Sequence, residues 1–153
     1  METTVVSYYT ASFSRDVVIA GHQQATRDFW LRLAQHFETY VSALVVEEAG
    51  RGDSVQAKMR LDAIAAFPVL DIDPEAEKLA ERIVAGGGIP DKYPEDALHI
   101  AIAAVNGINV IVTWNFTHLN NPFTKMMIRQ IVENEDYICP EIVSPNELLG
   151  EEP

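Results

Sequence analysis

Short apolar segments rich in β-branched residues alternate along this chain with longer segments of helical periodicity. Two of them, PVLDI (68–72) and INVIVTW (108–114), show little alternation of polar and apolar residues. This pattern is typical of parallel strands, which are buried on both faces because the connecting helices cover both sides of the sheet. We therefore predict an α/β fold with three layers, α/β/α, around a mainly parallel central sheet.

Start and stop signals set the expected bounds of the elements. Ser14 is a plausible N-cap, Ser42 can cap the helix after the first strand, and Asp73 with Pro74 begins a helix that the glycine triplet at 86–88 ends. In chain order we expect a helix at 14–37, a strand at 38–42, helices at 43–52 and 54–67, a strand at 68–72, helices at 74–88 and 93–107, a strand at 108–114, a helix at 121–136, an extended segment at 139–144 and a short helical turn at 144–150.

Length and composition predict one folded domain in a reducing compartment. The chain has 153 residues, 48% of them apolar, and no linker or repeat divides it, so we expect a single domain at 1–149 and a short acidic tail at 150–153. Cys139, the only cysteine, excludes an internal disulfide and is expected to be a small buried hydrophobe. The N-terminal segment lacks the features of a secretory signal, and no apolar run reaches the length of about 18 residues that suggests a membrane span. We expect a cytoplasmic protein with no membrane segment.

The charge balance restricts how nucleic acid can bind. Eleven basic residues stand against 23 acidic ones, for a net charge of −12. Binding through a broad basic surface is therefore disfavoured, and a nucleic-acid substrate must be held locally, with help from metal ions or a basic partner. The sequence also lacks the glycine-rich dinucleotide, P-loop and nucleophile-elbow motifs.

Polar side chains stand at both ends of one apolar stretch, PEDALHIAIAAVNGINVIVTWNFTH (94–118). The predicted helix is about 18 Å long and the strand that follows it, running in the opposite direction, is about 23 Å long. Asp96 and Asn115 are therefore expected at the same edge of the sheet. The same geometry brings Glu47 or Glu48 near this edge. Converging carboxylate and carboxamide oxygens suit Mg²⁺ or Mn²⁺.

Simpler structural roles compete with this hypothesis. Asp96 lies in a first helical turn, where a carboxylate favours the helix dipole by about 0.3–1 kcal/mol. Glu47 and Glu48 fit a solvated helix face, and only one of two consecutive residues can point inward. His99 is expected to be a satisfied buried or rim histidine, with stacking or a hydrogen bond near the site as the alternative, and His118 is expected to stay outside the site. We expect Trp114 and Phe116 to belong to the core, with a base-stacking surface as the alternative.

Three segments, SALVVEEAGRG, EDALHIAIAA and VIVTWNFTH, together resemble the PIN-domain ribonucleases, most closely the toxins of VapBC-type toxin–antitoxin pairs. The resemblance spans almost the whole chain, from ETTVVSYYTASFSRD to SPNELLG. The family pattern is an acidic residue followed by Thr, a Glu in the helix after a strand that ends in Ser, an Asp that opens an Ala-rich helix, and T-x-D/N at the end of the next strand. It falls here on Glu2 and Thr3, Glu48, Asp96, and Thr113 and Asn115.

What the resemblance implies is Mg²⁺- or Mn²⁺-dependent hydrolysis of single-stranded or loop RNA by a VapC-like toxin. Glu2, Glu48 and Asp96 would be metal ligands, directly or through water, and Asn115 an outer ligand. Thr3 and Thr113 would support the site. The resemblance also implies a cognate antitoxin and a homodimer. The alternative is a PIN-fold module that binds RNA or protein and cleaves weakly or not at all.

The chain departs from the family pattern in three places. Many relatives have Asp where Glu2 and Asn115 stand here, and several apolar residues of a first central strand usually precede the acidic residue, whereas only Met1 does so here. We therefore expect either a lost first strand or a truncated start. A competing interpretation makes TTVVSYY (3–9) the first strand, which would place Glu2 at its wrong end.

Overall fold

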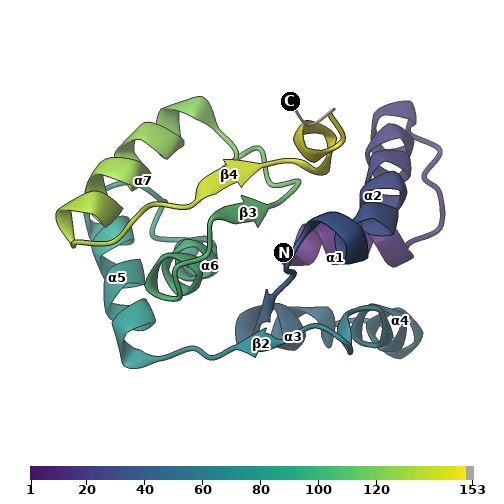
Figure 1. Ribbon diagram of the computed structural model, residues 1–153, viewed down its shortest axis with the longest axis horizontal. Helices are drawn as coiled ribbons and strands as arrows, with labels where there is room; N and C mark the ends of the chain where they lie inside the picture. The colour runs from purple at the N-terminus through teal and green to yellow at the C-terminus, as the bar shows by residue number, and fades with distance from the viewer. Residues whose placement is uncertain (151–153) are drawn as a thin grey trace.

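Parallel strand pairs lie among helices in the computed structural model, which describes residues 1–150 (Figure 1). In chain order the elements are α1 (Thr3–Thr10), α2 (Val17–His36), β1 (Val41–Ser42), α3 (Ala43–Ala49), α4 (Ser54–Ile64), β2 (Val69–Leu70), α5 (Pro74–Ala85), α6 (Pro94–Val105), β3 (Val110–Val112), α7 (Pro122–Asn134), β4 (Glu141–Val143) and the 3-10 helix η1 (Pro145–Leu148). The predicted α/β class is confirmed. Apart from Gly150, the predicted tail lies outside the described residues.

The strands form two separate pairs. β1 pairs in parallel with β2, with Val41 opposite Val69, and β3 pairs in parallel with β4, with Ile111 opposite Ile142. Figure 1 shows α5, α6 and α7 near β3 and β4, α3 and α4 near β2, and the N-terminus between these two groups. The predicted parallel pairing is therefore confirmed, but the described strands make two two-stranded sheets in place of one continuous central sheet.

Met1 and Glu2 connect the two strand pairs. The amino nitrogen of Met1 donates to the carbonyl oxygen of Tyr40 at 2.8 Å, just before β1, and the N–H of Glu2 donates to the carbonyl oxygen of Val112 at 3.0 Å, in β3. Burial lowers the pKa of the Met1 amino group to about 6, against the opposing effect of the Glu2 carboxylate. One hydrogen bond on each side thus links the segment to both strand pairs, and the bond to Val112 places Glu2 at the carboxyl end of β3.

Helices cover both faces of β3. Successive strand residues point to opposite faces, and here Ile111 packs into an apolar cluster with α5, α6 and α7, whereas Val112 packs with α1 and α2 around Phe29 and Trp114. A third cluster joins α1 to β1, α3 and α4. The layers predicted from the non-alternating strands therefore surround β3. Cys139 is buried in the first cluster, as expected.

Residues 3–10 form a helix, so the interpretation of TTVVSYY as a strand is wrong. Glu2 is the N-cap of α1, and its side chain accepts a hydrogen bond from the N–H of Thr4. Val5 and Val6 are fully buried in two different clusters. Strand propensity is a weak preference that packing readily overrides, and burial of both valines against α2 and α4 decides the conformation here.

The first long helix begins later than predicted. Asp16 is the N-cap of α2, where its carboxylate accepts from the N–H groups of Val18 and Ile19. Ser14 lies two residues before this N-cap, where its hydroxyl accepts from the N–H of Asp16. The expected cap at Ser14 is therefore wrong, because a carboxylate two residues further on satisfies two free helix N–H groups at once.

The predicted caps at Ser42 and Asp73 are confirmed. The Ser42 hydroxyl accepts from the N–H of Val45, and the Asp73 carboxylate accepts from the N–H of Ala76 at 2.9 Å. Pro74 is the first residue of α5, whose C-cap is Gly86 in the glycine triplet. The caps explain why these helix starts follow directly from the sequence.

The Asp73→Ala variant is expected to lower the free energy of unfolding by about 1 kcal/mol, because the N–H of Ala76 loses its acceptor. Urea denaturation followed by circular dichroism measures this difference. Glu81→Ala, at an exposed position beyond the first turn of the same helix, is the control and should change stability by less than about 0.5 kcal/mol. Equal effects of the two substitutions would contradict the capping role.

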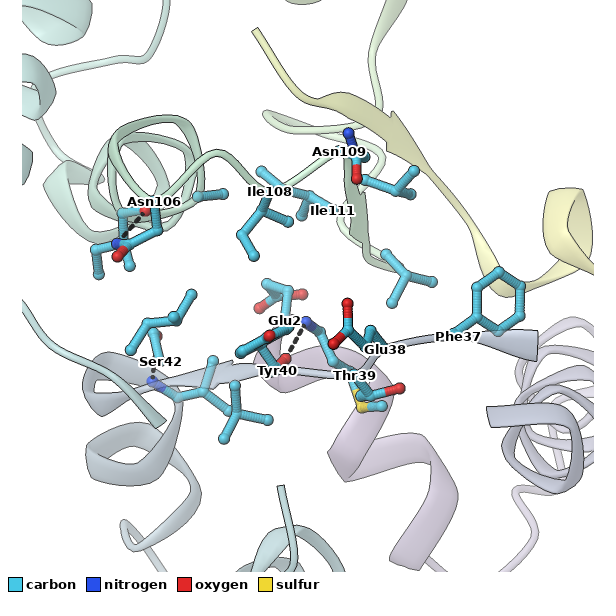
Figure 2. Close-up of a pocket in the computed structure, with 18 of the residues that line it drawn as sticks. Glu2, Phe37, Glu38, Thr39, Tyr40, Ser42, Asn106, Ile108, Asn109 and Ile111 are labelled. Carbon is cyan, nitrogen blue, oxygen red and sulfur yellow. Dashed lines mark hydrogen bonds between the residues drawn. The ribbon is translucent and has the colours of Figure 1, made fainter. Parts of the chain in front are cut away.

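None of the described helices has the length and hydropathy that a bilayer-spanning segment needs. The strands are shorter than predicted: residues 38–40, 68, 71–72, 108–109 and 113–114 lie outside them. Residues 38–42 and 108–112 instead line a cavity of about 500 Å³ between the two strand pairs (Figure 2). Glu2 lies on the wall of this cavity, beside Met1.

Candidate metal centre

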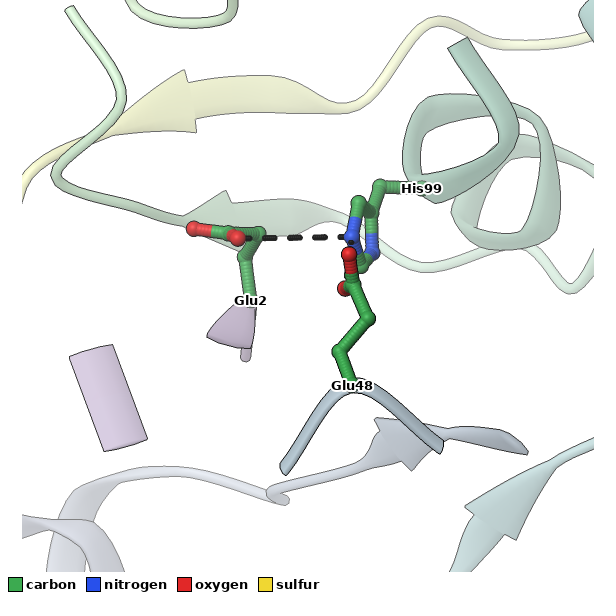
Figure 3. Close-up of side chains that lie close together, drawn as sticks. All are labelled: Glu2, Glu48 and His99. Carbon is green, nitrogen blue, oxygen red and sulfur yellow. Dashed lines mark ion pairs between the residues drawn. The ribbon is translucent and has the colours of Figure 1, made fainter. Parts of the chain in front are cut away.

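Glu2 is held rigidly between α1 and the end of β3. Its Oε2 atom accepts hydrogen bonds from the Thr4 N–H at 3.2 Å, from the Thr4 hydroxyl, and from the Thr113 hydroxyl at 2.7 Å. The residue is 6% exposed. A buried carboxylate requires such donors because water no longer solvates it. The three donors meet at one oxygen, and the other, Oε1, faces His99 (Figure 3).

Glu48 reaches the same place from the last turn of α3. Its Oε1 atom accepts from the Thr3 hydroxyl at 2.7 Å and lies 2.6 Å from Nε2 of His99. Burial alone would raise the pKa of Glu48, but the hydrogen bond and charge of His99, the hydrogen bond of Thr3 and the charge of Arg51 outweigh it, and the pKa lies below its usual value. The carboxylate is therefore charged at neutral pH.

Glu47, the neighbouring glutamate, points away from this site. It pairs with Arg51 at 2.8 Å in an exposed i, i+4 ion pair. Consecutive helical residues point about 100° apart, so only one of the two glutamates can face inward. The structure turns Glu48 inward.

His99 completes the group from α6. The residue is 7% exposed, and its Nε2 atom lies 4.0 Å from Oε1 of Glu2 and 2.6 Å from Oε1 of Glu48. Ligand atoms of these three residues lie within 4.8 Å of one another. Figure 3 shows the three side chains pointing toward one another from α1, α3 and α6. A buried histidine was expected here, but its place between the two glutamates was not.

Asp96 and Asn115 meet at a different residue, His118. Oδ2 of Asp96 lies 2.8 Å from Nδ1 of His118, and Oδ1 of Asn115 accepts from the His118 N–H at 3.0 Å. The Tyr93 ring lies against the imidazole, with ring centroids 4.3 Å apart. The strand and helix thus return to one edge, as their lengths predict. Among the described His, Cys, Asp and Glu residues, however, the group that can share one metal ion does not include Asp96.

Aromatic side chains flank the end of β3. Trp114 is buried, stacks on His22 at 4.2 Å and donates its indole N–H to the Thr26 hydroxyl, which confirms that it belongs to the core. Phe116 differs from this expectation, because it is 46% exposed. Its ring lies 5.9 Å from that of His22 and 6.0 Å from that of Trp114. The exposed ring is next in sequence to Asn115.

A sequence profile of the PIN domain matches residues 17–116, which is 100 of the 153 residues. The chain belongs to the PIN domain family. Neither the curated proteins nor the solved structures compared with it give a match. PIN domains are typically metal-dependent nucleases, and the α/β arrangement with short parallel strands agrees with the PIN fold.

The PIN match covers Glu48, Asp96 and Asn115, whereas Glu2 precedes it. The structure nevertheless brings Glu2 beside Glu48, although they lie far apart in sequence. Two carboxylates and one imidazole nitrogen are a donor set that fits a divalent cation. Without a cation the two carboxylates would repel each other, and His99 lies between them in the structure.

Sequence reasoning missed two residues that build this PIN site. Thr4 holds Glu2 with both its N–H and its hydroxyl, and the hydroxyl also accepts from the N–H of Trp114 at 2.9 Å. His99 lies three residues after Asp96 in α6, among buried apolar neighbours. Those neighbours are the signal from which its role could have been found, because a polar residue on an otherwise apolar helix face needs a buried partner.

Proposed function

We propose that this PIN domain is a metal-dependent endoribonuclease and the toxin of a toxin–antitoxin pair. The observation that carries the proposal is the convergence of Glu2, Glu48 and His99 from three separate segments. Mg²⁺ or Mn²⁺ is the proposed cofactor. Such a cation polarises the scissile phosphate and lowers the pKa of a bound water, which generates a nucleophile at neutral pH.

Glutamates and threonines of the site have different proposed roles in metal binding and catalysis. The Glu2 and Glu48 carboxylates would hold the cation, while Thr113, Thr4 and Thr3 fix their orientation by donating to them. The second oxygen of Glu48 can accept a proton from the attacking water, since this carboxylate is charged at neutral pH.

Asp96 and Asn115 lie with His118 at the same edge. We assign them the role of outer ligands that act through water.

RNA must be held by local contacts, because the net charge of −12 opposes a broad phosphate-binding surface. The exposed ring of Phe116 offers a face on which one base can stack, close to Asn115. Single-stranded or loop RNA is the substrate class that suits this arrangement, since its bases are free to leave the helical stack.

A cognate antitoxin and a second copy of the chain are the proposed protein partners. The acidic surface suits a basic segment of an antitoxin. Phe123 and Met126 on α7 are largely exposed and supply apolar surface for a protein contact.

A second candidate function is a PIN-fold module that binds RNA or protein but cleaves poorly. Two observations favour it: Asp96 lies outside the group formed by Glu2, Glu48 and His99, and the strongly negative charge opposes RNA binding. The two candidates differ in their response to metal and to loss of Asp96.

Cleavage of a mixed RNA pool distinguishes these functions. The nuclease should cleave with Mn²⁺ or Mg²⁺, stop when EDTA removes the metal, and resume when Mn²⁺ is restored. Asp96→Asn should cleave about 10-fold more slowly than wild type, as expected for loss of an outer ligand. Equal cleavage by the two proteins would exclude a catalytic role of Asp96, and a folded wild type that never cleaves would favour the binding module.

A further inference from the structure

His99 is an exception on a helix built to be apolar. Its neighbours in α6, among them Ala97, Ile100, Ala101 and Ile102, are buried hydrophobic residues. An imidazole in such surroundings needs polar partners, because its desolvation is unfavourable. In the described part of the chain, the ion-pair partners of its Nε2 atom are the carboxylates of Glu2 and Glu48. The residue therefore serves the acidic site and does not simply fill the core.

One oxygen of each glutamate faces His99: Oε1 of Glu2, to which no threonine donates among the described hydrogen bonds, and Oε1 of Glu48, which also accepts from the Thr3 hydroxyl. The threonine donors to Glu2 meet at Oε2, while Oε1 of Glu2 faces Nε2 of His99 at 4.0 Å. On the other side, Glu48 presents Oε1 at 2.6 Å and is also held by Thr3. Nitrogen and oxygen atoms from α1, α3 and α6 thus surround one small volume.

We propose that Nε2 of His99 is a direct ligand of the divalent cation, and that this nitrogen selects first-row transition-metal ions, such as Mn²⁺ and Co²⁺, over Mg²⁺. The proposal rests on the proposed function only in that a cation binds at this site. The proposed ligand is a nitrogen atom, which the acidic pattern in the sequence does not include. A residue of α6 would therefore determine which metal ion binds.

The selectivity follows from ligand chemistry. Mg²⁺ prefers an octahedron of oxygen ligands and keeps several waters, so an imidazole adds little to its binding. Imidazole nitrogen binds transition-metal ions more strongly, and affinity rises from Mn²⁺ to Co²⁺ along the Irving–Williams order. A site of two carboxylates and one imidazole should therefore bind Co²⁺ most tightly, Mn²⁺ next and Mg²⁺ least.

In the rival explanation, His99 is protonated and its positive charge takes the place of a metal ion. A protonated imidazole between Glu2 and Glu48 would neutralise them and compete with a metal ion for the same oxygens. The two explanations predict opposite results when His99 is removed. Loss of a ligand weakens metal binding, whereas loss of a competitor strengthens it.

Metal binding to purified protein, measured by calorimetry with Mg²⁺, Mn²⁺ and Co²⁺ alone, separates these explanations. In His99→Leu, the Kd for Mn²⁺ and Co²⁺ should rise by about 10- to 100-fold, a range typical for perturbed metal sites, and that for Mg²⁺ should rise much less. His99→Asp replaces the nitrogen ligand with an oxygen ligand, so this variant should bind metal more tightly than His99→Leu but without the preference for transition-metal ions. His36→Asn, at the end of α2, is the control for removal of a histidine and should bind as wild type does.

Pulsed electron paramagnetic resonance of the Mn²⁺-loaded wild type gives a test that does not depend on how the variants fold. Coupling of Mn²⁺ to an imidazole nitrogen is expected in wild type and in His36→Asn, and it should be absent from His99→Leu and His99→Asp. Mn²⁺ binding without nitrogen coupling, or tighter binding in His99→Leu, would overturn the role of His99 and leave the proposed nuclease intact. Failure of the wild type to bind any of the three metals would overturn both proposals.

Discussion

The Glu48→Gln variant is expected to cleave RNA at least about 100-fold more slowly than wild type, since it loses a charged ligand and not merely an outer contact. The glutamine carbonyl can still accept the hydrogen bond from Thr3, so the fold around α3 should be kept. What disappears is the negative charge that would neutralise the cation. Single-turnover cleavage at fixed Mn²⁺ concentration, with circular dichroism as a check on folding, measures the effect.

Glu47→Gln is the matched control for this variant. Glu47 is adjacent in sequence, carries the same charge and makes only an exposed ion pair with Arg51. Such pairs contribute little to stability, so this variant should cleave at the wild-type rate. If both substitutions slow cleavage to the same extent, a change in overall charge explains the loss and Glu48 is not a ligand.

The helices after α1 were predictable because their signals are local. Asp73 and Pro74 fix the start of α5 through a side-chain cap and a preset φ angle, and Gly86 marks its end. α6 begins at Pro94, where the preset φ angle of proline acts without a side-chain cap, because its N-cap Tyr93 makes no capping hydrogen bond. Such features depend on a few neighbouring residues, so one sequence is enough to find them.

The strand ends were not predictable, because strand length depends on partners from distant segments. Residues 38–40 have suitable strand composition, but they border the cavity, and β1 is restricted to Val41 and Ser42 opposite β2. Residues 3–9 have equally suitable composition and form a helix, since Val5 and Val6 are buried against other helices. Tertiary contacts decide both cases.

The candidate site was predictable as a region but not as a set of contacts. The lengths of α6 and β3 place Asp96 and Asn115 at one edge, and both contact His118 there. Which side chain of α6 faces Glu48 depends on the rotation of the helix about its axis. That rotation is set by packing of the apolar face, and it brings His99 to Glu48 while Asp96 points toward His118.

Packing around Phe29 supports both the fold and the site. Phe29 is 1% exposed in the middle of α2, where it packs with Val5 of α1, Val112 of β3 and Trp114. The Val112 carbonyl oxygen accepts from the N–H of Glu2, and the backbone N–H of Trp114 donates to the Thr4 hydroxyl. The ring therefore packs directly behind the segments that position Glu2.

The Phe29→Ala variant should lower the free energy of unfolding by about 3–5 kcal/mol and the Tm by about 6–20 °C. Leu31→Ala, which removes a side chain that is 79% exposed on the same helix, should change stability by less than about 0.5 kcal/mol. Chemical denaturation of the two variants and wild type measures the difference. Similar stabilities would show that α2 is not packed against β3 as described, and with that the placement of Glu2 beside Glu48 would lose its support.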